Sequence, residues 1–130
     1  MSSSADYFKR NADGDEYAGD HLLIEFWGAQ DLTDVEWIQH ALERAAEAAN
    51  ATVMHSSFHT FGDNKGVSGV TLLAESHLSI HTWPERCYAA IDVFMCGACD
   101  PKLTLACLEE AFKPARVDTR LLQRGIADKP

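Results

Sequence analysis

The stretch LLAESHLSIHTWPE, residues 72–85, places several reactive side chains where a plain apolar strand would be expected. Ser76 offers a hydroxyl nucleophile, and His77 and His81 offer imidazoles that could move protons or bind a metal. Glu75 and the last residue of the stretch, Glu85, add two carboxylates. This combination indicates acid–base or nucleophilic chemistry, provided that the fold brings the groups together.

The spacing of these groups limits what they can do within one chain. His77 and His81 would share one face of a helix, as in helical zinc sites, but the pair Trp83-Pro84 and the β-branched residues around it favour an extended backbone. In a regular strand, successive side chains point to opposite faces, so Ser76 and His81 would point apart. The spacing therefore gives little support to a local Ser–His hydrolase pair.

Two residues outside this stretch could also take part in a site. Ser68 lies between Val67 and Gly69, where small residues permit a close backbone approach, although a bulge or an edge position would give the same pattern. Cys96 ends an apolar run and precedes Gly97, so its thiol could reach a cleft. Alternatively, Cys96 could simply pack in the core as a small apolar side chain.

The bulk composition excludes some classes of partner. The formal net charge is -9, from 11 Lys and Arg against 20 Asp and Glu, which argues against nucleic acid and anionic membranes as partners. No apolar run approaches the ~20 residues of a membrane span. Residues 1–20 lack an apolar signal core and predict a polar N-terminal arm.

The four cysteines predict reduced thiols in a cytoplasmic protein, because no secretory signal is seen. Cys96-Gly-Ala-Cys99 has the spacing of a redox or zinc motif. A zinc site would need a second close pair, which Cys87 and Cys107 do not provide, so no metal site is expected.

The apolar pattern predicts one domain, residues 21–130, with the element order strand, helix, several strands, helix, strand. Thr33 and Glu36 have the spacing of a capping box at the start of the first helix, and Asn50 can end it. Pro101 is expected at the first position of the second helix. The strands are expected at 21–27, 51–61, 67–74, 87–95 and 115–125, with a turn at 62–66. Two helices on one face of a mainly antiparallel sheet, an α+β two-layer sandwich, is the economical architecture.

Three motifs occur in order at tight spacing: GVSGV at 66–70, AESHLSIHTWPE at 74–85 and YAAIDVFMCG at 88–97. With HLLIEFWG at 21–28, they closely resemble the small, pyruvoyl-dependent S-adenosylmethionine decarboxylase proenzymes of prokaryotes. The resemblance extends over about residues 21–125. It implies an enzyme that supplies aminopropyl groups for spermidine synthesis.

The resemblance implies that the chain makes its own cofactor. Ser76 Oγ would attack the carbonyl of Glu75, the amide would become an ester, and β-elimination would then break the chain. Elimination would release residues 1–75 and leave dehydroalanine at position 76. Hydrolysis of the dehydroalanine, with loss of ammonia, would then give a fragment 76–130 that begins with a pyruvoyl group in place of Ser76. The pyruvoyl ketone would form a Schiff base with the substrate amine and accept the electrons released as carbon dioxide leaves.

The family's other functional residues carry over onto matching positions of this chain. They are Ser68 and His81 for self-processing, Cys96 as the proton donor after decarboxylation, Glu85 for the ribose hydroxyls, Phe61 for adenine stacking, and Glu25 near the active site. Small members of the family are homodimers with active sites shared between protomers. A shared site would allow Ser76 and His81 to meet even though one strand points them apart.

One loop departs from the family pattern. The family usually has a proline between the aromatic residue and GVSGV, whereas this chain has Gly62-Asp63-Asn64-Lys65. Asp63 could pair with a basic substrate or simply form the turn. Decarboxylation of ornithine or arginine by the same cofactor therefore remains an alternative. A non-processing pseudoenzyme is a second alternative, which the presence of Ser68, Ser76, His81 and Cys96 argues against.

Overall fold

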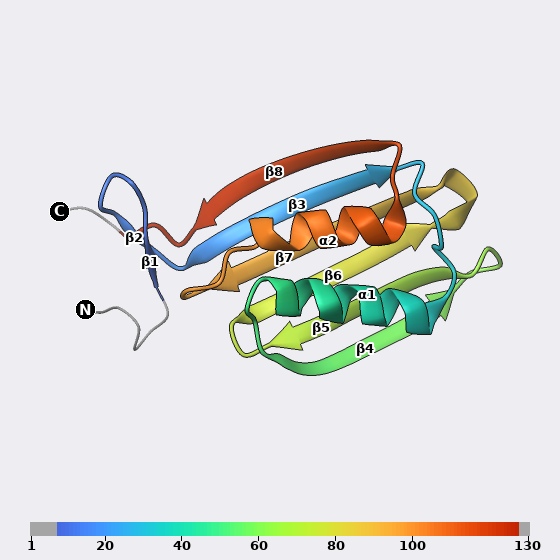
Figure 1. Cartoon of the computed structure of the whole chain (residues 1–130), viewed down its shortest axis with the longest axis horizontal. Helices are drawn as coiled ribbons and strands as arrows, with labels where there is room; N and C mark the ends of the chain where they lie inside the picture. Colours follow the sequence, from blue (N-terminus) through green and yellow to red (C-terminus); the bar gives the residue numbers. More distant parts are fainter. Residues whose placement is uncertain (1–7, 128–130) are drawn as a thin grey trace.

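The computed structural model describes residues 8–127, which form a sheet, two helices and a small hairpin (Figure 1). Within these residues the main sheet is six-stranded and antiparallel, with the strand order β4-β5-β6-β7-β3-β8. The strands are β3 (Gly19–Trp27), β4 (Val53–Phe61), β5 (Gly66–Leu73), β6 (Ser76–Trp83), β7 (Tyr88–Cys96) and β8 (Arg116–Arg124). The helices are α1 (Val35–Ala48) and α2 (Lys102–Phe112), and a short 3-10 helix, η2, spans Pro84–Arg86.

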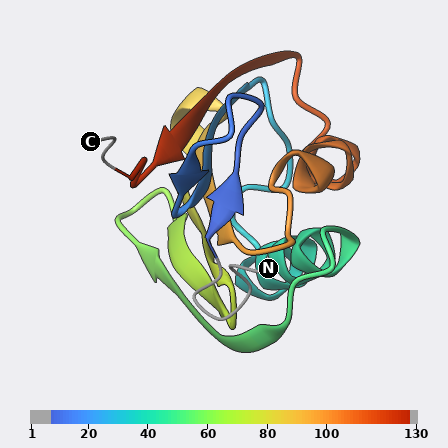
Figure 2. The same ribbon diagram turned by 90° about the vertical axis from the view of Figure 1, so that its left-hand side faces the viewer.

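Both helices cover the same face of the sheet, as Figure 2 shows in a view along the strands. The predicted α+β two-layer arrangement of two helices on one antiparallel sheet is confirmed. Every predicted strand is present within one or two residues of its expected bounds, and the stretch that contains Ser76 and His81 forms β6. Neither helix is long and apolar enough to cross a membrane within the described residues.

The core lies between the helices and the covered face of the sheet. Alternate residues of β3, namely Leu22, Ile24 and Phe26, are buried beneath the helices. Phe26 is fully buried and its ring centroid lies 6.2 Å from that of Phe112 on α2. Burying each such large apolar side chain stabilises the fold by about 1.5–3 kcal/mol. The contacts with the helices therefore stabilise this face of the sheet, and the opposite face is not covered by a helix.

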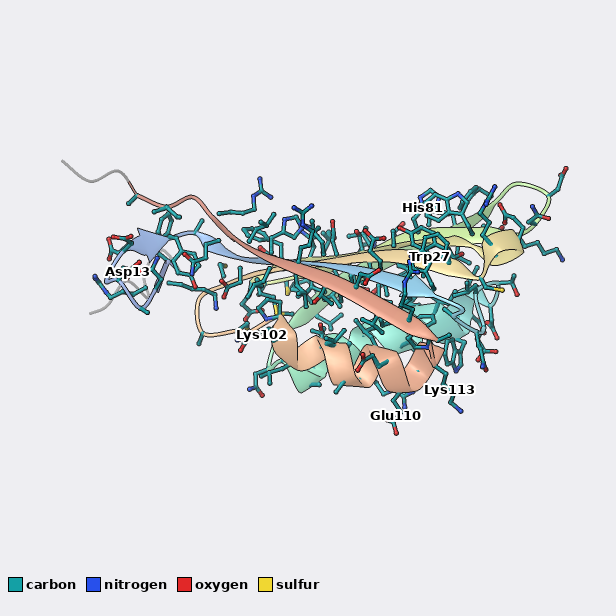
Figure 3. All side chains as sticks on the ribbon, turned by 90° about the horizontal axis from the view of Figure 1, so that it is seen from above. Asp13, Trp27, His81, Lys102, Glu110 and Lys113 are labelled. Atoms are coloured by element: carbon teal, nitrogen blue, oxygen red, sulfur yellow. The ribbon has the colours of Figure 1, made fainter. Side chains whose placement is uncertain are left out.

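The face of the sheet away from the helices, called the open face below, carries the polar side chains that alternate with the core residues. On β6 the buried residues Leu78 and Ile80 alternate with His77, Ser79 and His81, which are only partly buried. Figure 3 shows His81 on the side of the sheet opposite to the helices. The period of two thus assigns the reactive residues of β6 to one surface.

The first helix begins one residue later than the capping box predicts. Asp34, not Thr33, is the N-cap, and its carboxylate accepts a hydrogen bond of 3.1 Å from the backbone N–H of Trp37. Glu36 then falls in the first turn, where its negative charge interacts favourably with the positive end of the helix dipole. Asn50 follows the helix with a left-handed φ of 63°, consistent with the expected stop. Similarly, Pro101 is the N-cap of α2 rather than its first residue.

Part of the expected polar arm is folded. Strands β1 (Lys9–Arg10) and β2 (Glu16–Tyr17) form a two-stranded hairpin beside the main sheet (Figure 1). Tyr17 is buried and donates a hydrogen bond to Asp20, so an apolar ring holds the hairpin against the domain. The ordered chain therefore starts before residue 20, and residues 1–7 of the expected arm lie outside the described residues.

Replacing the N-cap tests the corrected helix start. We expect Asp34→Ala to lower the free energy of unfolding by about 1 kcal/mol, because the backbone N–H of Trp37 loses its acceptor. Thr33→Ala, the matched control, should change it by no more than a few tenths of a kcal/mol. Urea unfolding followed by circular dichroism measures both values. A larger loss for Thr33→Ala than for Asp34→Ala would contradict this assignment.

Candidate active site

The peptide bond between Glu75 and Ser76 lies in the tight turn that joins β5 to β6. Ser76 has a φ of 144°, a positive value that residues other than glycine rarely adopt. Such a conformation costs about 1–3 kcal/mol and persists only where the surrounding structure imposes it. The turn is held on both sides, since β5 and β7 both pair with β6 at this end.

Two hydrogen-bond donors of Cys96 converge on the carbonyl oxygen of Glu75. The backbone N–H of Cys96 donates to this oxygen at 3.1 Å, and the thiol Sγ donates to the same atom at 3.1 Å. Cys96 ends β7, and Gly97, with a φ of 65°, turns the chain away behind it. Paired donors polarise a carbonyl and stabilise negative charge on its oxygen if a nucleophile attacks the carbon.

The side chain of Glu75 is also fixed. Its carboxylate accepts a hydrogen bond of 3.0 Å from the backbone N–H of Thr52 and a longer one of 3.4 Å from the Thr52 hydroxyl. Thr52 lies in the segment before β4, 23 residues away in sequence. It thus holds one side of the turn while Cys96 holds the carbonyl. The role of Thr52 could not be predicted, because nothing in the local sequence shows which backbone the turn will contact.

Ser68 and His81 lie together at the other end of β6. They are direct partners in the register between β5 and β6, and both side chains face the open side of the sheet. The ring of Phe61 meets that of His81 edge-on at 4.6 Å, and Trp83 stacks on His81 at 4.1 Å with an interplanar angle of 13°. The imidazole is therefore held between two aromatic rings beside a hydroxyl.

Glu85 and Phe61 line one small cavity of about 60 Å³ next to this group. Glu85 is in η2, directly after β6, and Phe61 is the last residue of β4. The loop that departs from the family pattern, including Asp63 and Asn64, also lines this cavity, together with Thr82 and Trp83 at the end of β6. An aromatic ring that can stack on a planar group and a carboxylate that can accept hydrogen bonds from hydroxyls thus lie at one small opening.

Glu25 lies on the open face of β3 and is bound by a residue that sequence analysis did not single out. The hydroxyl of Tyr88 donates a short hydrogen bond to the Glu25 carboxylate. Burial raises the pKa of Tyr88 to about 12, and the hydrogen bond and negative charge of Glu25 add to this effect. Trp27 packs on Tyr88 with ring centroids 4.3 Å apart. Tyr88 therefore stays protonated at neutral pH and fixes the position of the carboxylate.

The candidate residues consequently form two separate groups within one chain. Ser76 and Cys96 lie at one end of β6, and Ser68, His81 and Phe61 lie at the other. The five residue-to-residue steps from Ser76 to His81 span about 16 Å of extended strand. The two groups cannot touch in a single copy, so any chemistry that needs both requires a second chain.

All four cysteines are free thiols. Cys96 and Cys99 donate to different carbonyls, those of Glu75 and Asn50, so the pair does not form a common site. Burial raises the pKa of the Cys99 thiol, and the negative charge of Glu75 contributes further. Cys99 is thus a buried, protonated thiol, whereas Cys96 contacts the peptide bond described above.

Comparisons with known proteins identify the family of the chain. The family model for S-adenosylmethionine decarboxylase matches residues 20–125. The chain is 40% identical over 109 residues to an S-adenosylmethionine decarboxylase proenzyme of Thermomicrobium roseum, covering 83% of this chain and 94% of that one. It is 42% identical over 113 residues to a proenzyme of the same name from Methanococcus maripaludis, covering 85% and 92%.

A solved structure has the same fold. The crystal structure of the adenosylmethionine decarboxylase from Aquifex aeolicus superposes with a TM-score of 0.78 at 35% sequence identity. The match covers 88% of this chain and 96% of the other. Similarity therefore extends over the whole sheet and both helices rather than over the motifs alone.

Proposed function

The chain belongs to the S-adenosylmethionine decarboxylase family, and we propose that it is a proenzyme that cuts itself at Glu75–Ser76 and then decarboxylates S-adenosylmethionine. The observation that carries the self-cleavage step is the pair of Cys96 donors on the Glu75 carbonyl at a strained Ser76. The product would be decarboxylated S-adenosylmethionine, the aminopropyl donor for spermidine synthesis.

The geometry supports attack by Ser76 Oγ on the carbonyl carbon of Glu75. Negative charge then develops on the carbonyl oxygen, where the backbone N–H and the thiol of Cys96 already donate. A single donor of this kind contributes about 10²–10³-fold to rate in acyl-transfer enzymes. The positive φ of Ser76 favours the reaction further, because breaking the amide relieves a costly backbone conformation.

Cleavage would leave the two fragments interleaved in one sheet. In the strand order, β4 and β5 belong to residues 1–75, β6 and β7 to residues 76–130, β3 again to 1–75, and β8 to 76–130. Separating the fragments would break the pairing of β5 with β6 and both pairings of β3. The cut chain should therefore stay folded.

The residues around Ser76 fit a pyruvoyl group formed at that position. Such a group supplies an electrophilic carbonyl that accepts the electrons released with carbon dioxide. The Cys96 thiol contacts the peptide beside Ser76, which supports a role in returning a proton to the substrate carbon. Phe61 and Glu85 would hold the adenine and the ribose, and Glu25 would be oriented by Tyr88.

We propose that the active enzyme is a homodimer whose open faces stack. Face-to-face sheets lie about 10 Å apart, close enough for side chains of both to meet. Within one copy, Ser76 and Cys96 lie about 16 Å from His81, which is on the open face. A two-fold arrangement could bring Ser68 and His81 of one protomer to the Glu75–Ser76 turn of the other, where His81 would handle the protons of ester formation and elimination.

Intact-mass spectrometry tests the self-cleavage. We expect the purified wild-type chain to yield fragments 1–75 and 76–130, with the second fragment carrying a pyruvoyl group that reacts with hydroxylamine. Ser76→Ala should remain a single 130-residue chain, because it has no hydroxyl to form the ester. A wild-type chain that stays uncut and does not react with hydroxylamine would overturn the proposal.

Release of carbon dioxide tests the substrate. The cut enzyme should act on S-adenosylmethionine and leave ornithine and arginine essentially unreacted, because Phe61 and Glu85 suit a nucleoside. Phe61→Leu should raise KM for S-adenosylmethionine several-fold, since base–aromatic stacking contributes about 1–3 kcal/mol. Release from either amino acid, with none from S-adenosylmethionine, would reverse the assignment.

Co-expression of two differently tagged variants tests whether the sites are shared. In a mixed dimer, the Ser76→Ala chain supplies an intact His81 and the His81→Ala chain supplies an intact Ser76. If the sites are shared, one of the two sites then contains both residues. We expect the His81→Ala chain to be cut in the mixture and to be cut far more slowly alone. If mixing gives no increase in cutting, Ser76 and His81 do not act across a subunit boundary.

A further inference from the structure

Three ligand-forming side chains that the proposed mechanism does not use converge on the open face: His21 on β3, His77 on β6 and Asp92 on β7. His77 and His21 lie in one register row, with Phe94 of β7 between them. Asp92 is two residues before Phe94, so it faces the same side of the sheet, diagonal to both imidazoles. The three ligand atoms all lie within 4.8 Å of one another.

The carboxylate of Asp92 is fixed in place, but neither histidine completes a hydrogen bond to it. The hydroxyl of Ser79 donates to Asp92 Oδ1 at 2.7 Å. The Nε2 atoms of His21 and His77 lie 3.5 Å and 3.7 Å from the two carboxylate oxygens, longer than a good N–H···O bond. His21 Nε2 is moreover buried without any hydrogen-bond partner, which is costly for a polar atom.

We propose that His21, His77 and Asp92 bind a divalent transition-metal ion of the zinc class. Two imidazole nitrogens and one carboxylate with an open fourth position are an established ligand set for such ions. Ligand atoms about 2.0–2.1 Å from a tetrahedral ion lie about 3.3–3.4 Å apart. The two histidine–aspartate distances, each to a different carboxylate oxygen, are close to this spacing, and all three ligand atoms lie within 4.8 Å of one another. Side-chain rotations that bring both imidazoles and one carboxylate oxygen to a common centre would close the site.

The surroundings define which ions fit. Imidazole ligands favour zinc, cobalt or nickel over magnesium and calcium, which prefer all-oxygen sites. The net charge of -9 attracts cations to the protein in general. Arg124 opposes binding, because its Nη1 lies 3.4 Å from Nδ1 of His21 and would have to move when that nitrogen carries the proton.

The position of the site gives the ion a structural consequence, which rests on the proposed cleavage. After a cut between Glu75 and Ser76, His21 would belong to the first fragment, and His77 and Asp92 would belong to the second. A bound ion would thus cross-link the fragments on the open face. Since binding to the folded state stabilises it, the ion should raise the melting temperature of the cut protein.

Titration of the metal-free full chain with Zn²⁺ and Co²⁺ tests the site. We expect about one ion per chain and visible Co²⁺ bands typical of a four-coordinate nitrogen and oxygen site. Asp92→Asn and His21→Gln, which nearly preserve shape, should weaken binding about tenfold or more. His55→Ala, an exposed histidine on the same face outside the cluster, is the matched control and should leave affinity unchanged.

Two further variants separate this site from other sources of binding. Arg124→Gln should tighten binding, because the opposing cation is replaced by an amide whose oxygen can accept a hydrogen bond from the Nδ1–H of His21. Cys99→Ala should leave affinity unchanged. Loss of binding in Cys99→Ala, or intense sulfur-to-cobalt charge-transfer absorption, would place the ion on thiols and overturn the proposal.

The uncut Ser76→Ala chain distinguishes failure of this inference from failure of the proposed function. It should bind Zn²⁺ as the wild type does, because all three ligands are intact and no cleavage is needed. Circular dichroism checks that each variant is folded. Absence of stoichiometric binding by folded wild-type chain, or equal affinity in the Asp92→Asn and His21→Gln variants, would overturn the metal site whether or not the chain is cut.

Discussion

The register of β6 between β5 and β7 is the constraint on which the rest of the site depends. It sets Ser68 opposite His81 at one end, and it brings the end of β7 to the Glu75–Ser76 turn at the other. A slip of one residue would turn His77 and His81 toward the helices and move Cys96 away from the Glu75 carbonyl. The apolar residues Leu78 and Ile80, fully or almost fully buried, oppose that slip.

This constraint also explains how the chain maintains an unfavourable backbone at Ser76. The conformation costs free energy locally, but the turn is enclosed by strand pairing and by hydrogen bonds from Cys96 and Thr52. The same sheet carries its stabilising apolar contacts on one face and its polar groups on the other. Contacts with helices α1 and α2 therefore stabilise one face of the sheet, while polar side chains such as His77 and His81 lie on the other face.

Much of this architecture could be predicted from local patterns. The runs of strand-forming residues at 21–27 and 87–95, and the capping and proline signals at the starts of the two helices, predicted the elements, because these local preferences act within a few residues. The start of α1 was wrong by one residue, since Thr33 and Asp34 are both good caps and only backbone geometry selects between them. The folded hairpin at residues 8–17 was missed because its stability comes from the burial of one ring, Tyr17, against the domain.

The sequence by itself determined the identity of the reactive groups, their order along the chain and the family to which the chain belongs. It also showed that Ser76 and His81 could not act as neighbours on one regular strand. Only the tertiary structure decided that Cys96 contacts the Glu75 carbonyl, that Thr52 holds the Glu75 side chain, and that His21 joins His77 and Asp92. These contacts join residues 15 to 71 positions apart, and local sequence carries no record of which strands will become neighbours in a sheet.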